Sequence, residues 1–223
     1  MKRIVFLCSG GGGNLRFLNA AIHKGFASGM EISGVLTDRS CGALTYAIEA
    51  GIFNKVFSYN KYNRSDLYDA LKNLDSDVII TNIHKILDDA IVDDFSGRLI
   101  NLHYSLLPSF GGSIGEQPVK DAIEAGCKFV GATTHYVERK VDSGKIIGQV
   151  AVPVDPNARF PETMNTVFRA GCLLLLNSLY LLDHQADAGH RGNTTIGESC
   201  GFFSPALSFD AERQNHDIWK EIE

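Results

Sequence analysis

Several features that would define a class of protein are missing from this 223-residue chain. Its five cysteines show no Cys-x-x-Cys spacing, so neither a disulfide framework nor a zinc site is indicated. Lysine and arginine are scattered and the formal charge is −5, which argues against a basic face for nucleic acid. The apolar stretch 171–182 is too short for a membrane span, and the N-terminal run 4–8 is too short for a signal peptide. We therefore expect a cytoplasmic protein that binds neither nucleic acid nor membranes.

The first half of the chain alternates short apolar runs with segments of helical periodicity. Strands are expected at 4–7, 32–36, 56–57, 78–81 and 99–102, and helices from about residue 14 and at 42–50, 65–74 and 85–93. Leu67, Ala70, Leu71 and Leu74, for example, recur at the spacing of one helix face. This alternation predicts βαβ units around a parallel sheet.

The second half breaks the alternation. A helix is expected from Pro118 to Ala125, followed by strands at 129–137 and 146–154 that a short polar turn would pair antiparallel, and by a helix from Pro161 to about Leu182. The prediction is thus an α/β fold with a Rossmann-like, mostly parallel twisted sheet flanked by helices. It occupies residues 1–184, and the polar segment 185–223 is a C-terminal extension of unknown role. Packing back onto the domain and self-association are both open for this extension, and so is the choice between monomer and homodimer.

Asn101 and His103 lie at the end of an expected strand, and period-two alternation puts their side chains on one face. An amide donor and an imidazole on one face can hydrogen-bond a developing oxyanion and handle a proton, while a carboxylate such as Asp142 can orient the imidazole or a water. This combination suggests acyl or one-carbon transfer and requires no metal. The alternative is that Asn101 and His103 only cap a strand and satisfy nearby backbone groups.

A run of glycines, Ser9-Gly10-Gly11-Gly12-Gly13-Asn14, follows the first strand and opens the first helix. Backbone N–H groups at Gly11, Gly12, Gly13 and Asn14 could cradle a phosphate, although such a run can also be just a tight turn. The phosphate-loop Gly-Lys-Ser/Thr is absent, and Leu15 stands where the dinucleotide fingerprint needs its third glycine. A nucleotide-binding module without catalysis is therefore disfavoured but open, with Asp38 placed where a ribose-binding acid would lie.

Two blocks of sequence point to a family. Asn-Leu-His-Tyr-Ser-Leu-Leu-Pro at 101–108 and Val-Asp-Ser-Gly-Lys-Ile-Ile-Gly-Gln at 141–149 resemble, in order, the two hallmark blocks of the folate-dependent formyltransferases. The resemblance extends from the first strand to about Leu182. It implies the formyltransferase fold and formyl transfer from 10-formyltetrahydrofolate to the amine of a phosphorylated small molecule, with glycinamide ribonucleotide of purine biosynthesis as the expected acceptor.

The resemblance also implies roles for particular residues. Asn101, His103 and Asp142 would be catalytic, and His135 is either active-site support or a buried structural histidine. Gly11, Gly12, Gly13 and Asn14 would bind the phosphate of the acceptor. The folate would pair with backbone groups of the stretch Lys85, Ile86 and Leu87, and Arg64 would lie near it unless it is only a solvated arginine at a helix start.

Departures from the family pattern leave the acceptor open. Tyr104 replaces a proline, Gly13 replaces a serine, and Gly171 stands where enzymes that formylate glycinamide ribonucleotide have a ribose-binding glutamate. An amino sugar is an alternative acceptor. Strings at 107–110 and 131–137 are also similar to those of formyltetrahydrofolate hydrolase, which gives the formyl group to water, but that enzyme has an additional N-terminal regulatory domain and lacks the glycine loop. Here we expect the chain to start directly at the first strand.

Overall fold

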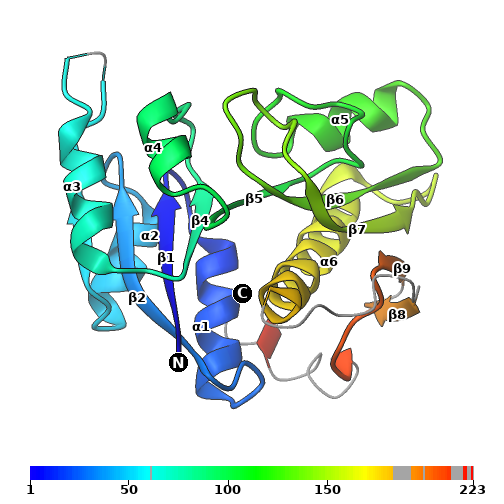
Figure 1. The fold of residues 1–223 in the computed structure, drawn as a ribbon. Coiled ribbons are helices and arrows are strands. Elements are labelled where there is room, and N and C mark those ends of the chain that lie inside the picture. Colours follow the sequence, from blue (N-terminus) through cyan, green and yellow to red (C-terminus); the bar gives the residue numbers. More distant parts are fainter. Residues whose placement is uncertain (61, 183–191, 198, 212–217, 220–221, 223) are drawn as a thin grey trace. The chain divides into compact units, whose positions relative to one another are not determined.

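The chain forms two compact units in the computed structural model, which describes residues 1–60, 62–182, 192–197, 199–211, 218–219 and 222 (Figure 1). The first unit comprises Met1–Asn101 together with Ile218–Glu223, and the second comprises Leu102–Asp217. The boundary between the two units falls inside one strand, β5 (Leu99–His103). Within the described residues, no helix is long and apolar enough to cross a membrane.

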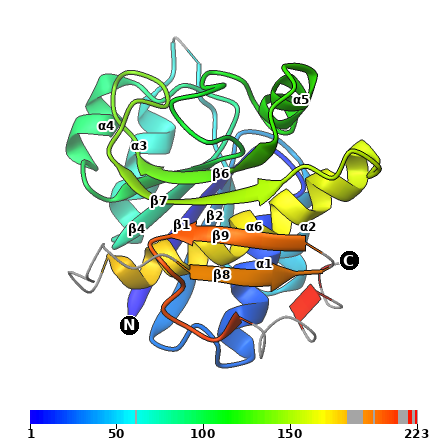
Figure 2. The same cartoon turned by 90° about the vertical axis from the view of Figure 1, so that its right-hand side faces the viewer.

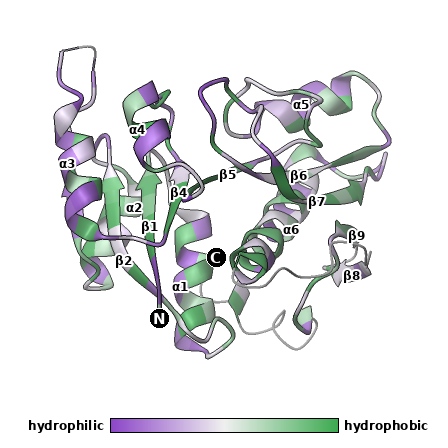
Figure 3. Cartoon of the chain, viewed as in Figure 1, coloured by the Kyte–Doolittle hydropathy of each residue, from purple (hydrophilic) through white to green (hydrophobic). Residues whose placement is uncertain are grey.

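The first unit is built on a parallel sheet with the strand order β3-β2-β1-β4-β5. Strands and helices alternate along it as follows: β1 (Lys2–Cys8), α1 (Gly13–His23), β2 (Met30–Thr37), α2 (Gly42–Glu49), β3 (Asn54–Val56), α3 (Ser65–Leu74), β4 (Val78–Asn82), α4 (Asp89–Asp94) and β5. Strand β1 lies at the centre, and its residues Ile4–Leu7 are fully buried. Such burial on both faces explains why these strands read as continuous apolar runs (Figure 3).

One expected helix starts later than its sequence suggested. The periodicity predicts a helix from residue 85, whereas α4 begins at Asp89 because the side chain of Asp88 caps it by accepting a hydrogen bond from the Ile91 N–H. Residues 83–88 therefore form an irregular segment after β4, and their backbone groups are not used up in a helix.

The second unit carries an antiparallel sheet with the order β6-β7-β9-β8 (Figure 2). Its elements are α5 (Gln117–Glu124), β6 (Phe129–Tyr136), β7 (Ile146–Pro153), α6 (Phe160–Leu181), β8 (Gly192–Ile196) and β9 (Ser199–Ser204). Helix α6 packs on β6 and β7 and buries an almost continuous stretch, 170–179. This burial, and not a membrane, accounts for the apolar character of the segment. The predicted α/β class with a mixed, mostly parallel sheet and flanking helices is confirmed.

The described part of the C-terminal extension joins this fold. Strand β9 pairs with β7, and Phe203 on β9 is buried. Asn177 on α6, which is itself fully buried, anchors the segment after β9: its Nδ2 donates to the Ala206 carbonyl (3.1 Å), and its Oδ1 accepts from the N–H (2.8 Å) and hydroxyl (2.9 Å) of Ser208. Further on, Trp219 belongs to the first unit and stacks on Phe17 of α1 with ring centroids 5.1 Å apart.

We expect Asn177→Ala to lower the free energy of unfolding by about 2–3 kcal/mol, because buried polar groups of the extension lose their partner. Chemical denaturation of the two proteins measures the difference. Asn193→Ala on the exposed side of β8 is the matched control and should change stability by less than about 0.5 kcal/mol. Equal effects of the two substitutions would contradict an anchoring role of Asn177.

Candidate functional site

Asp142 is the centre of a cluster of ionisable groups in the second unit. Its Oδ2 lies 3.6 Å from His103 Nδ1 and its Oδ1 lies 3.6 Å from His135 Nε2. The side chains are only 12%, 8% and 2% exposed for Asp142, His103 and His135, respectively. The Gly112 N–H donates to the same Oδ2 at 2.7 Å. The structure therefore brings together three of the residues named from sequence.

Two opposing effects set the charge of Asp142. Burial alone would raise the pKa of its carboxyl, but the contact with His135, the Gly112 N–H and the nearby charge of His103 outweigh burial and hold the pKa below its ordinary value. Because the folded-state pKa is lowered, the stabilisation from this carboxylate is present above the unfolded-state pKa and is lost only as the pH falls through the folded-state value. Asp142 is thus an anion throughout the neutral range.

Backbone carbonyls fix the protonation pattern of both histidines. His103 Nε2 is 3.2 Å from the Phe110 carbonyl, and His135 Nδ1 is 2.8 Å from the Tyr136 carbonyl. A carbonyl only accepts, so each of these nitrogens carries a proton. The ring nitrogen that faces Asp142 then carries no proton while the ring is neutral, and it could donate only if the ring were a cation. His103 Nδ1 and His135 Nε2 are therefore the two nitrogens that face the carboxylate of Asp142.

The loop that carries Asp142 depends on two unusual backbone positions. Asp142 has φ of 52°, a left-handed conformation that aspartate tolerates better than most residues. At Gly144, a Cβ would lie 1.8 Å from the Tyr136 carbonyl oxygen, so no side chain fits. These two requirements give a physical reason for the Asp-Ser-Gly sequence in the second block.

Thr133 and Gln149 are structural residues that the sequence reasoning did not single out. Thr133 Oγ1 donates to the Ser105 carbonyl (2.7 Å) and accepts from the Leu107 N–H (3.1 Å), and Gln149 Nε2 donates to the Leu107 carbonyl (2.9 Å). Both side chains thus hold the segment that follows His103. The glutamine at the end of the second block was visible in the sequence, but its partner was not.

Asn101 makes the contacts expected of a residue that satisfies nearby backbone groups at a strand end, which was the alternative to a catalytic role. Its Nδ2 donates to the carbonyl of Thr81 on β4 and lies 3.1 Å from Thr81 Oγ1. Thr81 Oγ1 donates in turn to the Ile100 carbonyl, so it accepts from Asn101. Asn101 therefore links β5 to β4 by hydrogen bonds within the first unit. Its catalytic role stays a prediction.

The glycine loop is braced at the carboxyl ends of three strands. The Oγ of Ser9, which follows β1, accepts a hydrogen bond from the His84 N–H at 2.9 Å. The same hydroxyl also contacts Asp38, which follows β2. The Ala43 N–H at the start of α2 donates to the Gly10 carbonyl at 3.0 Å. The loop thus presents a fixed backbone next to the N-terminus of α1, where N–H groups and the helix dipole favour an anion.

The glycines of this loop are required for different reasons. Gly12 has φ of 76°, and a Cβ there would lie 2.8 Å from Ala43 Cβ, so Gly12 is needed for packing. Gly10 and Gly11 have nothing within 4 Å of an ideal Cβ, so they border open space. The folded backbone therefore accounts for Gly12, whereas open space beside Gly11 is what the approach of an anion would use.

Asp38 does not offer a free acceptor for a ribose. Arg39 Nε and Nη2 donate to its two oxygens at 3.0 and 2.8 Å, and the side chain of Asp38 is 1% exposed. Burial alone would raise the pKa of Asp38, but hydrogen bonds from Arg39 and Ser9 lower it below its ordinary value. A carboxylate already neutralised by its neighbour weighs against the nucleotide-binding alternative.

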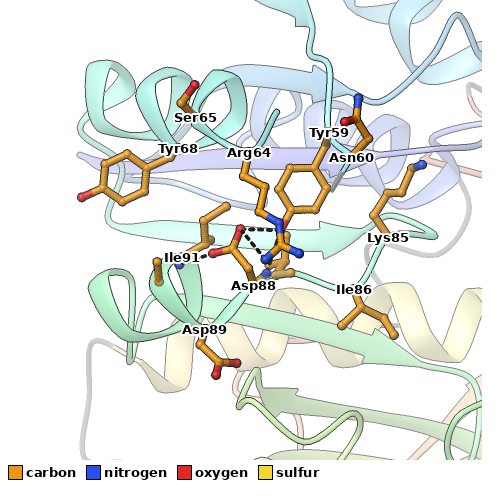
Figure 4. A pocket seen from close by; sticks show the side chains of 12 residues that line it. Tyr59, Asn60, Arg64, Ser65, Tyr68, Lys85, Ile86, Asp88, Asp89 and Ile91 are labelled. Atoms are coloured by element: carbon orange, nitrogen blue, oxygen red, sulfur yellow. Dashed lines mark hydrogen bonds and ion pairs between the residues drawn. The ribbon is translucent and has the colours of Figure 1, made fainter. Parts of the chain in front are cut away.

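An open pocket of about 930 Å³ lies wholly in the first unit, between the start of α3 and the segment that precedes α4 (Figure 4). Of the residues predicted to bind folate, it is lined by all four: Arg64, Lys85, Ile86 and Leu87. Its remaining lining residues are Tyr59, Asn60, Ser65, Tyr68, Asp88, Asp89, Ala90 and Ile91. Among the described residues, no group of three or more His, Cys, Asp or Glu side chains could hold a metal ion.

Comparison with known proteins places these features in a family. The model of the formyl transferase family matches residues 2–177. A chloroplastic phosphoribosylglycinamide formyltransferase of Arabidopsis thaliana is 33% identical over 165 residues, which cover 70% of this chain and 56% of that protein. The crystal structure of the phosphoribosylglycinamide formyltransferase from Anaplasma phagocytophilum has a TM-score of 0.73 at 31% identity and covers 81% of this chain and 86% of that one.

A formyltetrahydrofolate deformylase from Pseudomonas syringae shares the fold alone, with a TM-score of 0.72 at 22% identity over 89% of this chain and 65% of that one. The chain belongs to the formyl transferase family, as its two sequence blocks predicted. It spans about half the length of the plant relatives, 56% and 53%.

We expect Gly11→Ala and Gly12→Ala to affect folding differently. Gly12→Ala combines a left-handed backbone with a clash against Ala43 and should lower the free energy of unfolding by about 2 kcal/mol or more. Gly11→Ala meets no atom and should be close to neutral. Thermal and chemical unfolding of both variants test this difference. Similar stabilities would show that the loop backbone is not set as the structure has it.

Proposed function

We propose that this chain transfers the formyl group of 10-formyltetrahydrofolate to the amine of a phosphorylated small molecule, and that glycinamide ribonucleotide is that acceptor. The observation that carries the proposal is the buried contact of His103 with Asp142, in which a carbonyl and an N–H from the 110–112 segment fix both partners. The names of the relatives and the family membership support the same chemistry.

In this proposal His103 and Asp142 act as a proton-handling pair. Asp142 orients His103 from its Nδ1 side, so that His103 can donate through Nε2 to the negative charge that develops at the formyl oxygen. His135 supports the pair from the other carboxylate oxygen, since its proton on Nδ1 is fixed by Tyr136. These roles need no metal.

Asn101 supplies the second donor. It lies two residues before His103 on β5, so strand alternation sends the two side chains from the same face. One N–H of its amide would exchange Thr81 Oγ1 for the reacting oxygen, while the bond to the Thr81 carbonyl keeps the amide oriented.

The pocket of the first unit fits the folate. Its volume falls in the range of about 300–1,000 Å³ typical of small-molecule sites. Backbone groups at Lys85, Ile86 and Leu87 lie outside any helix and can pair with a heterocycle, and Arg64 adds a cation. When bound, the folate supplies the formyl group. Gly11, Gly12, Gly13 and Asn14 would receive the phosphate of the acceptor at the N-terminus of α1.

Two further parts of the proposal concern the cell compartment and the oligomeric state of the enzyme. None of its five cysteines forms a disulfide bond, which supports a reducing compartment such as the cytoplasm. For its assembly we keep both alternatives, monomer and homodimer, and small molecules as its partners.

The assay that tests the proposal measures tetrahydrofolate release with and without glycinamide ribonucleotide. We expect release only with the acceptor, because the amine must attack the formyl carbon. Release without an acceptor would instead establish a deformylase that uses water. Release that requires an amino sugar would keep the reaction and change the acceptor.

We expect His103→Ala and Asp142→Asn each to lower turnover about 100-fold or more in folded protein, because a donor or the charge behind it is lost. Asp155→Asn, which removes an exposed carboxylate from the same unit, is the control and should leave turnover unchanged. Asn101→Ala should be as damaging as His103→Ala, whereas Thr81→Val, which removes the hydroxyl partner of Asn101 and one hydrogen bond to the Ile100 carbonyl, should retain most activity. Near-normal turnover of His103→Ala would rule out its assigned role.

A further inference from the structure

Two of the cysteines, Cys8 and Cys41, flank the glycine loop from two different segments of the first unit. Cys8 is the last residue of β1 and is 1% exposed. Cys41 is the N-cap residue of α2 and is partly exposed. Neither the proposed chemistry nor the sequence analysis gives either thiol a role.

The segments that carry the two thiols pack against each other. The Ala43 N–H donates to the Gly10 carbonyl at 3.0 Å, and each of these residues is the second after its cysteine. An ideal Cβ at Gly42 would lie 3.1 Å from Gly11 Cα, so the two backbones approach as closely as a pair of glycines allows. The end of β1 and the start of α2 are therefore held together through the glycine loop.

The two thiols are also within electrostatic reach of each other. Burial raises the pKa of Cys8 to about 12, and the charge of Cys41 adds to this rise. Asp38 raises the pKa of Arg39 through hydrogen bonds and its own charge, and Cys41 adds to that rise as well. Cys41 thus lies near both a buried thiol and a guanidinium, so that a thiolate at Cys41 has a cation nearby.

The two thiols differ in their access to solvent. Cys8 keeps its proton at neutral pH, and burial shields it from oxidants in solution. Cys41 is partly exposed, and among the described residues its side chain makes no hydrogen bond that caps α2. A partly exposed thiol near an arginine is the kind that an oxidant reaches first, whereas a buried thiol beside it is placed to react with the product.

We propose that Cys41 and Cys8 are a peroxide-sensitive thiol pair, and that their oxidation to a disulfide disables the glycine loop as the binding site for the phosphate of the acceptor. The second half of this inference rests on the proposed function, which assigns that phosphate to the loop. In a reducing compartment such a disulfide is transient, as expected of a redox sensor and not of a structural bridge.

The oxidation requires a peroxide and no other reagent. The Cys41 thiolate sulfur attacks one oxygen of hydrogen peroxide, the O–O bond breaks, and the departing hydroxide takes up the thiol proton as water, which leaves a sulfenic acid. The Cys8 sulfur then attacks the Cys41 sulfur, the S–O bond breaks, and hydroxide leaves with the Cys8 proton as a second water. Two thiols are oxidised, and one peroxide is reduced to two waters.

A disulfide at this place would displace the loop. It requires Cα atoms about 4.4–6.8 Å apart, with matching side-chain directions. Cys8 is fixed by the pairing of β1 with Thr37 of β2 and Asn82 of β4, so the adjustment falls on Cys41 and the start of α2. The close approach of α2 to Gly11 leaves no room for that adjustment, and the loop must move with the helix.

The test treats the native protein with hydrogen peroxide, removes the peroxide with catalase and maps disulfides by mass spectrometry of unreduced peptides. We expect a linked pair of peptides that contain Cys8 and Cys41, and dithiothreitol should separate them. In the same samples the Michaelis constant for glycinamide ribonucleotide should rise about tenfold or more, and that for 10-formyltetrahydrofolate should change less than about twofold. Dithiothreitol should restore both constants.

Three variants identify the residues responsible. Cys41→Ser should behave as the native protein before treatment and should lose both the linked peptides and the response to peroxide. Cys8→Ala should also lose the link, and dimedone should then trap Cys41 as the sulfenic acid. Cys127→Ser, which removes a partly exposed thiol from the second unit, is the matched control and should keep the link and the response. Cys41→Ser decides the question alone if Cys8→Ala does not fold.

The outcomes separate this inference from the proposed function. Treated protein without the Cys8–Cys41 link would overturn the inference, and so would linked protein whose Michaelis constant for the acceptor is unchanged. Reduced protein that transfers no formyl group would refute the proposed function instead, because the linked peptides are detected without turnover and still establish or exclude the thiol pair.

Discussion

The buried carboxylate of Asp142 holds together the cluster of the second unit on which the proposed chemistry depends. A buried anion is costly unless it is paired and hydrogen-bonded, and here two imidazoles and the Gly112 N–H share that task. The backbone that carries this carboxylate is unusual: Asp142 takes a left-handed conformation, and Gly144 leaves room for the Tyr136 carbonyl. If the carboxylate were removed, His103 and His135 would both lose the side chain that lies between them.

Much of the fold could be predicted because its signals are local. Apolar runs flanked by helix-period segments identify β1 to β5, and the missing helix between β6 and β7 identifies the antiparallel part. Asp142 could be matched with His103 because the two sequence blocks together resemble those of a family. That Ser9 lies near Asp38 and His84 also follows from the alternation of strands and helices, since parallel strands bring their carboxyl ends to one edge of the sheet.

The remaining contacts join residues with no pattern between them. Nothing in the sequence pairs Asn101 with Thr81, Asn177 with Ser208, or Tyr59 with Asp88, because each pair depends on the register of the packed elements. The late start of α4 has the same origin: helical periodicity extends to residue 85, but the cap at Asp88 decides where hydrogen bonding begins. Gly12 is the opposite case, because the sequence did suggest a role for it. That role was anion binding, whereas the structure shows that its left-handed φ and the close approach of Ala43 already require glycine there.

The proposed donors share one property that bears on catalysis. In the structure His103 Nε2 is hydrogen-bonded to the Phe110 carbonyl, and one N–H of Asn101 is hydrogen-bonded to the Thr81 hydroxyl. Both acceptors are therefore neutral groups. A neutral formyl oxygen gains little by displacing them, because it offers a hydrogen bond of the same kind. An oxygen that has acquired negative charge forms hydrogen bonds about twice as strong and can displace both. In the proposed mechanism the donors would then be engaged more fully in the transition state than in the bound substrate, which is the condition for accelerating the reaction and not merely tightening binding.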